Sequence, residues 1–255
     1  MSQNDRAGLF ASLHVIGDPL ILFNIWDPGS ARAVAEAGAK AIATGSWSVA
    51  AALGCDDGED LPLDLSLANA KRVVAAVALP VSIDFEGGYG QTPEAVAGNA
   101  KRLIETGAVG CNFEDQIVGG DGLYSIEEQC ARIAAIRRAA DQASVPFFIN
   151  ARTDLFLQAD PAAHADHLVE ATRRAEAYAR AGASGFFAPG LKQPEQIRKL
   201  CEQSPLPVNI MVMSDTPSNR DLAALGVARI SYGPTPYREM AASLLTAARQ
   251  ALAAG

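Results

Sequence analysis

The chain has 255 residues, 49% of them hydrophobic, and its 21 basic and 29 acidic residues give a formal charge of −8. This length and apolar content suit one sizeable folded core, while the acidic balance and the lack of a basic stripe exclude nucleic acid as an expected partner. No uninterrupted apolar stretch reaches about 18 residues, so we expect no membrane partner.

The cysteines and the first residues of the sequence indicate the cellular compartment in which we expect the protein. The four cysteines, Cys55, Cys111, Cys130 and Cys201, show no CxxC spacing, which predicts free thiols and argues against a zinc site. The opening MSQNDRAGLF lacks a basic region followed by an apolar stretch, the pattern of a secretion signal. We therefore expect a cytoplasmic protein.

Eight apolar runs with strand character follow one another along the chain, at residues 20–26, 41–45, 81–86, 109–115, 147–152, 185–189, 208–213 and 228–233. Most are continuously apolar rather than alternating, which is typical of parallel strands covered on both faces. Alanine-rich amphipathic segments separate them, and several end in a glycine suited to a helix C-terminus.

No linker interrupts this alternation. Eight βα units predict a single α/β domain over residues 1–255, a (β/α)8 TIM barrel. A doubly wound open sheet is the alternative, but such a sheet normally has fewer strands and a glycine-rich first turn. The first turn here reads WDPGSAR, without GxGxxG.

Acidic residues stand at the ends of neighbouring predicted strands, where a barrel places its chemistry. Asp84 and Glu86 are two residues apart, so a regular strand points both to one side. Glu114 ends the next strand and Arg152 the one after. Carboxylates that converge at low dielectric repel one another, and a hard divalent cation, Mg²⁺ or Mn²⁺, would relieve the repulsion. A pair of capping carboxylates before a surface loop is the alternative.

Glycines follow the acidic pair in SIDFEGGYG, where Gly87, Gly88 and Gly90 allow a sharp turn and a close approach to a ligand. Histidines, by contrast, are absent from the strand ends. His164 and His167 fall in a helix-like segment with acidic neighbours, which indicates a solvated face rather than a metal pair. Lysine is missing from strand ends too, so a Schiff-base mechanism has no evident nucleophile.

The ordered set NIWDPGSARAVAEAGAKAIATGSWSVAAALG, SIDFEGGYG, NFED and NARTD resembles the isocitrate lyase/phosphoenolpyruvate mutase superfamily over nearly the full chain. The resemblance implies a barrel with an exchanged C-terminal helix, Mg²⁺ at its mouth and a 2-oxo acid or its enolate as ligand. It implies that Asp84 binds the metal directly, that Glu86 and Glu114 hold metal-bound water, and that Asp57 is a further acid of the metal site.

The same resemblance implies substrate contacts. Gly45, Ser46 and Trp47 match a segment that binds the substrate carboxylate, and Arg152 matches an arginine that neutralises the bound carboxylate or oxyanion. Tyr89 follows the glycines and is expected to direct its hydroxyl toward the substrate. We also expect Trp26, in the NIWDPGSAR segment, and Asn209, near the end of the seventh strand, among the substrate contacts.

One segment departs from the superfamily pattern. Isocitrate and methylisocitrate lyases carry a K-[KR]-C-G-H loop soon after the fourth strand, and phosphonate enzymes carry a loop similar to KxNS. This chain reads DQIVGGDGLYSIEEQ there, with no cysteine, histidine or lysine. The two lyase activities are therefore rejected, and phosphorus–carbon chemistry is disfavoured. The glycines of this loop suit either a mobile gate over residues 115–128 or a plain solvated loop.

The predicted function is Mg²⁺-dependent carbon–carbon bond cleavage of a small 2-oxo acid or dicarboxylate, with oxaloacetate decarboxylation making the fewest demands on the site. The alternatives are phosphonopyruvate or phosphoenolpyruvate mutase chemistry and a non-catalytic 2-oxo-acid-binding barrel. The last segment, PTPYREMAASLLTAARQALAAG, is expected to form a helix that packs on a neighbouring subunit of a homodimer or homotetramer, and packing on its own barrel is the alternative.

Overall fold

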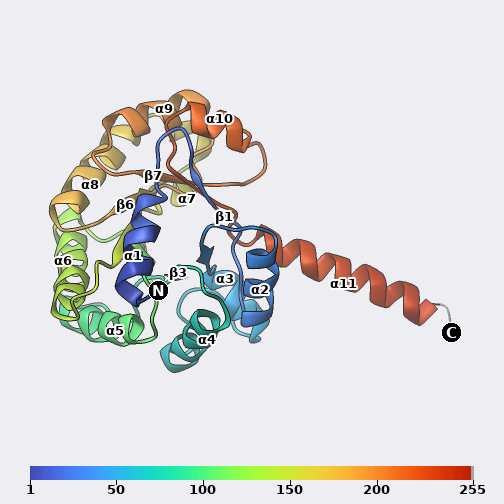
Figure 1. The fold of residues 1–255 in the computed structure, drawn as a ribbon. Coiled ribbons are helices and arrows are strands. Elements are labelled where there is room, and N and C mark those ends of the chain that lie inside the picture. Colours follow the sequence, from blue (N-terminus) through green and yellow to red (C-terminus); the bar gives the residue numbers. More distant parts are fainter. Residues whose placement is uncertain (254–255) are drawn as a thin grey trace.

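The computed structural model describes residues 1–253, which form a ring of eight parallel strands surrounded by helices (Figure 1). The strands are β1 (Leu20–Leu22), β2 (Ile42–Ala43), β3 (Val81–Asp84), β4 (Gly110–Glu114), β5 (Phe148–Arg152), β6 (Gly185–Phe187), β7 (Val208–Met211) and β8 (Arg229–Ser231). β1 pairs with β8, and a parallel bridge between Ile25 and Thr44 joins the β1 and β2 segments. The predicted TIM barrel is confirmed.

The helices between the strands are α2 (Pro28–Glu36), α3 (Ser46–Ala52), α4 (Leu63–Ala76), α5 (Pro93–Glu105), α6 (Ile126–Gln142), α7 (Leu155–Gln158), α8 (Leu168–Arg180), α9 (Pro194–Gln203) and α10 (Asn219–Ala224). Their starts follow local chemistry, because the side chains of Asp27, Thr92 and Ser125 each accept a hydrogen bond from a backbone N–H of the helix they precede. None of the described helices is both long and apolar enough to cross a membrane.

Most strand residues are buried because both faces of the strands are covered, whereas Ile21 of β1 is 44% exposed. Ile83, Cys111, Ile149 and Ile230 are at most 3% exposed, as the continuously apolar sequence runs predicted. The register sets Glu114 of β4 beside Arg152 of β5, and Asp84 of β3 beside Asn112 of β4. Residues at the carboxyl ends of different strands are thus brought to one end of the barrel.

The N-terminal helix α1 (Gln3–Ser12) covers the opposite end of the barrel, near its centre in Figure 1. Phe10 is fully buried and contacts Phe148 edge to face at 5.4 Å. His14 stacks on the same Phe148 ring at 4.1 Å. This helix therefore closes the end of the barrel at which the strands begin.

The segment around His164 departs from the sequence prediction. A short 3₁₀ turn, Pro161–Ala163, precedes it, and α8 begins only at Leu168. His164 is 3% exposed and packs edge to face on Phe156 at 5.3 Å, so the expectation of a solvated helical face is wrong for this residue. The acidic neighbours suggested exposure, but the ring of Phe156, eight residues earlier in the chain, packs against the imidazole.

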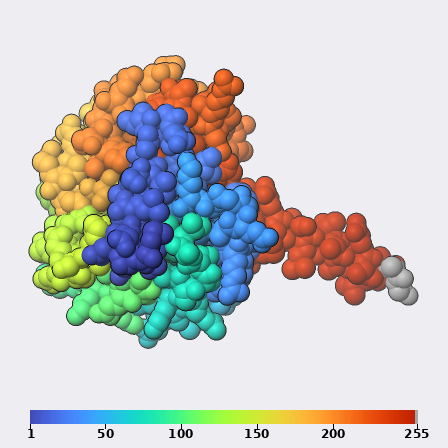
Figure 2. Space-filling view, viewed as in Figure 1, coloured from blue at the N-terminus to red at the C-terminus, as the bar shows by residue number. Residues whose placement is uncertain are grey.

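The last helix, α11 (Thr235–Ala253), projects away from the barrel (Figures 1 and 2). Pro236 is its only residue that the structure buries, and Met240, Leu244, Leu245 and Leu252 are all exposed. The alternative that this helix packs on its own barrel is therefore not what the structure has. Its predicted exchange with a neighbouring subunit stays a prediction.

Candidate active site

A cavity of about 160 Å³ opens at the carboxyl ends of the strands, and residues in or directly after all eight strands contribute to its wall. One part of the wall is polar and includes Asn24, Gly45, Ser46, Asp57, Asp84, Asn112, Arg152 and Ser231. The other part is apolar, with Trp47, Leu157, Phe187, Met211 and Pro234. The cavity is the size of a small organic acid rather than of a nucleotide or peptide.

Asp84 ends β3 and lies on the cavity wall. Its Oδ2 accepts a hydrogen bond from the N–H of Ser46 at 2.9 Å, and its Oδ1 accepts one from the amide of Asn112 at 3.3 Å. Its own N–H donates to the Thr44 hydroxyl at 2.8 Å. These contacts hold the carboxylate between β2 and β4 and aim it at the cavity.

Asp57 reaches the same wall from the loop after α3. The Ser46 hydroxyl donates to its Oδ1 at 3.3 Å. Burial raises the pKa of the Asp57 carboxyl, and the charge of Asp84 raises that pKa further. The Asp57 and Asp84 carboxylates are thus held at one cavity.

Glu86 is 5% exposed and has a positive φ of 49°, so the chain turns sharply directly after β3. Its Oε2 accepts hydrogen bonds from the N–H groups of Gly58 at 3.0 Å and Glu59 at 2.7 Å. Burial raises the pKa of Glu86 to about 7, and the charges of Asp84 and Asp57 act in the same direction. Glu86 therefore forms, with Asp57 and Asp84, a cluster of carboxylates that we call the acidic group. Glu86 lies next to the cavity but does not line its wall.

Tyr89 directs its hydroxyl to Glu86 rather than to the cavity, and donates to Oε1 at 3.1 Å. It lines a small adjacent space with Ser66 and Asn69. Burial raises the pKa of the Tyr89 phenol, and the charge of Glu86 raises it further. The Tyr89 hydroxyl, which was predicted to contact the substrate, is thus bonded to Glu86 in this structure.

Arg152, at the end of β5, forms the positive side of the site. Its Nη1 is 2.9 Å from Oε2 of Glu114, and its Nε and Nη2 both donate to the carboxylate of Asp154, the latter at 2.8 Å. Burial raises the pKa of Glu114, while the charge of Arg152 opposes that rise. One guanidinium thus balances two buried carboxylates and still lines the cavity.

The acids fit a hydrated Mg²⁺ better than a metal held only by protein ligands. Among residues 1–253, no three histidine, cysteine or carboxylate side chains gather closely enough to form a preformed metal site. Mg²⁺, however, commonly takes one or two carboxylates and keeps several waters. The oxygen-only donors match this preference, and a cation would relieve the raised pKa values that burial, with the charges of neighbouring carboxylates, gives Asp57, Glu86 and Glu114. Mn²⁺ has the same preference for oxygen.

The segment expected to bind the substrate carboxylate is placed at the cavity, but two of its backbone donors are engaged. The N–H of Gly45 donates to the carbonyl of Ile25 at 3.1 Å, and that of Ser46 donates to Asp84. The Trp47 side chain contacts the start of α11, with its ring 5.9 Å from that of Tyr237.

Two predicted substrate contacts lie away from the cavity wall. Trp26 packs edge to face against Tyr237 at 5.1 Å and against the small apolar cluster of Val49, Ala50 and Leu61. Asn209 is fully buried, and its amide exchanges hydrogen bonds with the hydroxyl of Ser231. Both side chains thus contact other residues of the protein, and neither lines the cavity.

The structure adds polar residues that the sequence reasoning did not single out. Asn112 accepts hydrogen bonds from Asn150 and Arg229, both at 2.9 Å, and so links Asp84 to the barrel interior. The oxygen of Asn24 accepts from the N–H groups of Tyr232 and Gly233. An asparagine inside an otherwise apolar strand run was the available signal for both.

Comparison with known proteins places these observations in a family. The model of the phosphoenolpyruvate phosphomutase family matches residues 10–252. The 2-methylisocitrate lyase of Escherichia coli K12 is 30% identical over 94% of this chain and 82% of its own length. The oxaloacetate decarboxylase of Pseudomonas entomophila L48 is 28% identical over 92% of this chain and 81% of its own length.

A solved structure is also similar to this chain over nearly its full length. A Burkholderia cenocepacia J2315 protein, named provisionally as a phosphonomutase, is 49% identical to this chain and superimposes with a TM-score of 0.96. The match covers 98% of this chain and all of that one. The fold that carries this cavity is thus similar to that of proteins named as a lyase, a decarboxylase and a phosphonomutase.

Proposed function

The chain belongs to the isocitrate lyase/phosphoenolpyruvate mutase superfamily, and from this premise we propose that it is a Mg²⁺-dependent enzyme that cleaves a carbon–carbon bond of a small 2-oxo acid through an enolate. Decarboxylation of oxaloacetate or a related lyase reaction is the form we propose. The observation that carries the proposal is that Asp84 and Arg152 line the same cavity. Asp84 lies close to other carboxylates, and Arg152 supplies a positive charge at the cavity wall.

Each side chain has a definite task in this proposal. Asp84 would bind the cation directly, and Glu86, Glu114 and Asp57 would hold its water ligands. Bound Mg²⁺ would supply Lewis acidity and draw electron density from the 2-oxo group. Arg152 would place a second positive charge near the oxygen on which negative charge develops as the carbon–carbon bond breaks.

Decarboxylation asks less of this site than retro-aldol cleavage does. A retro-aldol reaction needs a base, and the Tyr89 phenol is a poor one, because it donates to Glu86 and burial raises its pKa. Loss of carbon dioxide needs no base and no protein nucleophile, and water can protonate the enolate. The described residues that line the cavity include no histidine, lysine or cysteine, which agrees with a reaction that needs neither a protein base nor a protein nucleophile.

A calorimetric titration with oxalate, with and without Mg²⁺, tests the binding half of the proposal. A turnover screen over oxaloacetate, 2-methylmalate-type acids and phosphonopyruvate tests the chemical half. We expect oxalate to bind only with Mg²⁺ and oxaloacetate to be consumed. Tight Mg²⁺-dependent binding without turnover of any of these acids would instead indicate a binding protein, and absence of binding would refute the proposal.

Phosphorus–carbon chemistry is a second candidate, supported by the family model and by the similarity to the Burkholderia protein. The segment between β4 and α6 opposes it, since residues 116–124 read QIVGGDGLY and contain neither lysine nor asparagine. Release of inorganic phosphate from phosphonopyruvate, or its conversion to phosphoenolpyruvate, would favour this candidate over decarboxylation.

We also propose that the protein is a cytoplasmic homodimer or homotetramer. All four cysteines are free thiols, which suits a reducing compartment. A groove of about 550 Å³ beside β1 and α2 is lined by apolar residues that include Leu20, Ile21, Phe23 and Val34. The exposed leucines of α11 have no apolar partner within the described chain, and this groove on a second copy would cover them.

A further inference from the structure

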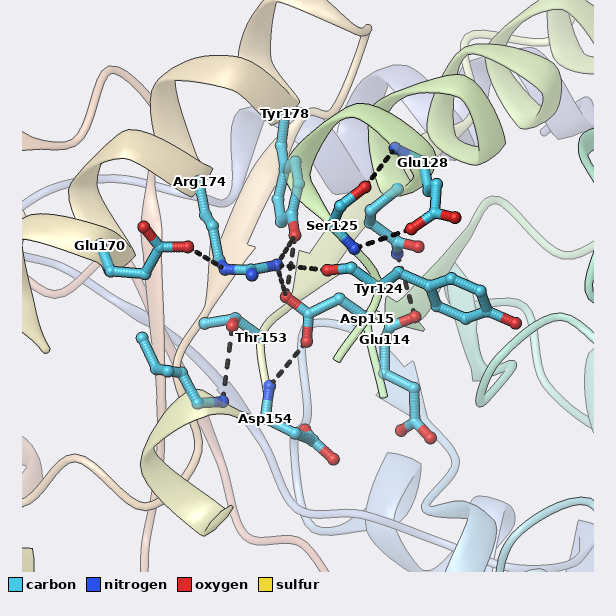
Figure 3. Close-up of polar contacts among 12 residues, drawn as sticks. Glu114, Asp115, Tyr124, Ser125, Glu128, Thr153, Asp154, Glu170, Arg174 and Tyr178 are labelled. Carbon is cyan, nitrogen blue, oxygen red and sulfur yellow. Dashed lines mark hydrogen bonds and ion pairs between the residues drawn. The ribbon is translucent and has the colours of Figure 1, made fainter. Parts of the chain in front are cut away.

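We propose that Asp115, Arg174 and Tyr178 form a positioning cluster, which holds Arg152 in the orientation that the cavity requires. This inference rests on the proposed function only in assigning Arg152 a role in substrate binding; the contacts that hold Arg152 do not depend on it. Figure 3 shows the cluster between the ends of β4 and β5 and helix α8.

The placement of Arg152 depends on Asp154. Two of the three guanidinium nitrogens of Arg152 donate to the Asp154 carboxylate. Asp154 is 1% exposed and lies two residues after β5, in the turn that leads to α7. Because Glu114 of β4 also holds the guanidinium, a small rotation of this turn would move the Asp154 carboxylate away from Arg152 and break their pair.

Asp115 holds that turn in place. The N–H of Asp154 donates to Oδ1 of Asp115 at 3.0 Å, as drawn in Figure 3. The N–H of Asp115 in turn donates to the carbonyl of Arg152 at 3.0 Å. Asp115 thus contacts the chain at Arg152 and at Asp154, on the two sides of Thr153, although its carboxylate is fully buried and does not line the cavity.

Helix α8 supplies the partners that a buried carboxylate needs. Arg174 Nη1 donates to Oδ2 of Asp115 at 3.0 Å, and the Tyr178 hydroxyl donates to the same oxygen at 2.8 Å. One helical turn separates the two residues, so both face Asp115 from one side of the helix. A buried charge without such partners is strongly destabilised, which explains why the cluster is complete.

Arg174 also contacts the segment between β4 and α6. Its Nη1 lies 3.1 Å from the carbonyl of Tyr124, and the N–H of Tyr124 donates to the carbonyl of Asp115 at 2.8 Å. Arg174 therefore contacts the end of the glycine-containing loop directly and acts on the turn that carries Asp154 through Asp115. Supporting residues of this kind typically change activity or affinity by roughly 10- to 100-fold when replaced.

The test compares Arg174→Gln and Tyr178→Phe with Arg173→Gln, all in the full chain. Arg173 is the neighbour of Arg174 on α8, its side chain is 69% exposed, and its nearest carboxylate oxygen lies 4.0 Å away, so the same substitution there serves as a matched control. Tyr178→Phe removes one hydroxyl and keeps the aromatic ring, which makes it the milder variant should Arg174→Gln fail to fold.

Two measurements are made on each folded variant. Crystal structures show whether the Arg152 guanidinium still pairs with Asp154. Calorimetry with Mg²⁺ measures the dissociation constant for oxalate. We expect Arg152 to leave Asp154 or to occupy several rotamers in the cluster variants, with roughly tenfold weaker oxalate binding. Arg173→Gln should match the wild type in both.

The outcomes separate this inference from the proposed function. An unchanged Arg152–Asp154 pair in both cluster variants overturns the positioning role, whatever the ligand data show. A lowered melting temperature with unchanged Arg152 geometry and unchanged oxalate affinity marks a merely structural network and overturns it too. If Arg152 is displaced while the wild-type protein binds no oxalate, the positioning role stands and the proposed function fails.

Discussion

A single carboxylate, that of Asp84, accepts hydrogen bonds from the start of α3 and from β4. Asp57 and Glu86 lie nearby, and burial together with the charge of Asp84 raises the pKa of each. Arg152 and Glu114 complete the arrangement on the neighbouring strands. At the scale of single residues the site is thus a group of carboxylates beside the guanidinium of Arg152, which is 17% exposed.

Asp84→Asn should abolish Mg²⁺-dependent turnover and Mg²⁺-dependent oxalate binding. The substitution keeps the size of the side chain but removes the charge that a hard cation requires. Asp64→Asn on the surface of α4 is the control, because the Asp64 side chain is 81% exposed. Calorimetry and a turnover assay read the result, and turnover retained in Asp84→Asn would exclude the role of metal ligand.

Arg152→Ala should lower kcat by roughly two to three orders of magnitude, or about 3–4 kcal/mol, as does the loss of other preorganised electrostatic groups. Because the change leaves Glu114 and Asp154 buried without their cation, Arg152→Lys is measured beside it. Lysine keeps the charge but lacks the fork that contacts both acids. Wild-type kcat in folded Arg152→Ala would contradict the role.

His14 should make the protein less stable as the pH falls. Burial lowers the pKa of His14 from 6.5 to about 3, and the charge of Arg229 adds to the effect. Between these values the unfolded chain binds the proton and the folded chain does not, so the free energy of unfolding decreases as the pH drops. This one group should contribute a loss of about 2 kcal/mol between pH 7 and pH 5.

Urea denaturation of the wild type and of His14→Phe at pH 7 and pH 5 measures this contribution. Phenylalanine keeps an aromatic ring against Phe148 and removes the titrating group. The wild type should lose about 2 kcal/mol more than the variant over this interval. Equal losses in the two proteins would show that His14 titrates in the folded state as it does in the unfolded one.

At the scale of elements, the barrel is organised by strand pairs rather than by individual contacts. β4 and β5 pair over five residues, from Gly110 beside Phe148 to Glu114 beside Arg152. The same pairing brings the acid and the arginine of the site together. Errors in this register would therefore displace the chemistry as well as the core.

Gly110→Ala should destabilise the protein because this pairing leaves no space for a side chain. A Cβ at Gly110 would lie 2.6 Å from the backbone carbonyl oxygen of Phe148, and a paired backbone has little freedom to shift. We expect a loss of about 1–3 kcal/mol, the usual effect of overpacking. Denaturant unfolding measures it.

Gly98→Ala is the matched control, since Gly98 lies in the interior of α5 with nothing within 4 Å of an added Cβ. Alanine there should stabilise the helix by up to about 1 kcal/mol. The same glycine-to-alanine change is thus expected to act in opposite directions at the two positions. A neutral effect of Gly110→Ala would mean that β4 and β5 are less tightly paired than the structure indicates.

At the scale of the whole molecule, α11 connects the site to the outer surface. Pro234 lines the cavity, and Tyr237 and Arg238 contact the Trp47 ring at the base of the helix. The rest of α11 extends away from the barrel (Figure 2), and its residues Leu244, Leu245 and Leu252 are exposed. Assembly through this helix would therefore be anchored at the mouth of the cavity.

The double substitution Leu244→Asp and Leu245→Asp should convert the expected oligomer to monomers. Ile21→Lys, in the apolar groove beside β1, should have the same effect if that groove receives α11 of another copy. Gln250→Glu, on the exposed part of α11, is the control. Light scattering measures the mass, and an oligomer that survives both the helix and the groove changes would exclude this interface.

The sequence by itself determined the barrel and the strand-end positions at which the site lies. The eight apolar runs and the placement of Asp84, Glu114 and Arg152 at strand ends are local patterns, and parallel packing converts them into one cluster. Local periodicity carries this information because a strand buried on both faces must be apolar along its length.

Only the tertiary structure decided which partner each polar side chain has. The hydroxyl of Tyr89 meets Glu86, Asn209 pairs with Ser231, and Trp26 packs under α11, none of which a strand-end pattern specifies. Asp115 is 59 residues from Arg174, which holds it. Such contacts join segments far apart in the chain, and the packing of whole helices against strands sets their geometry.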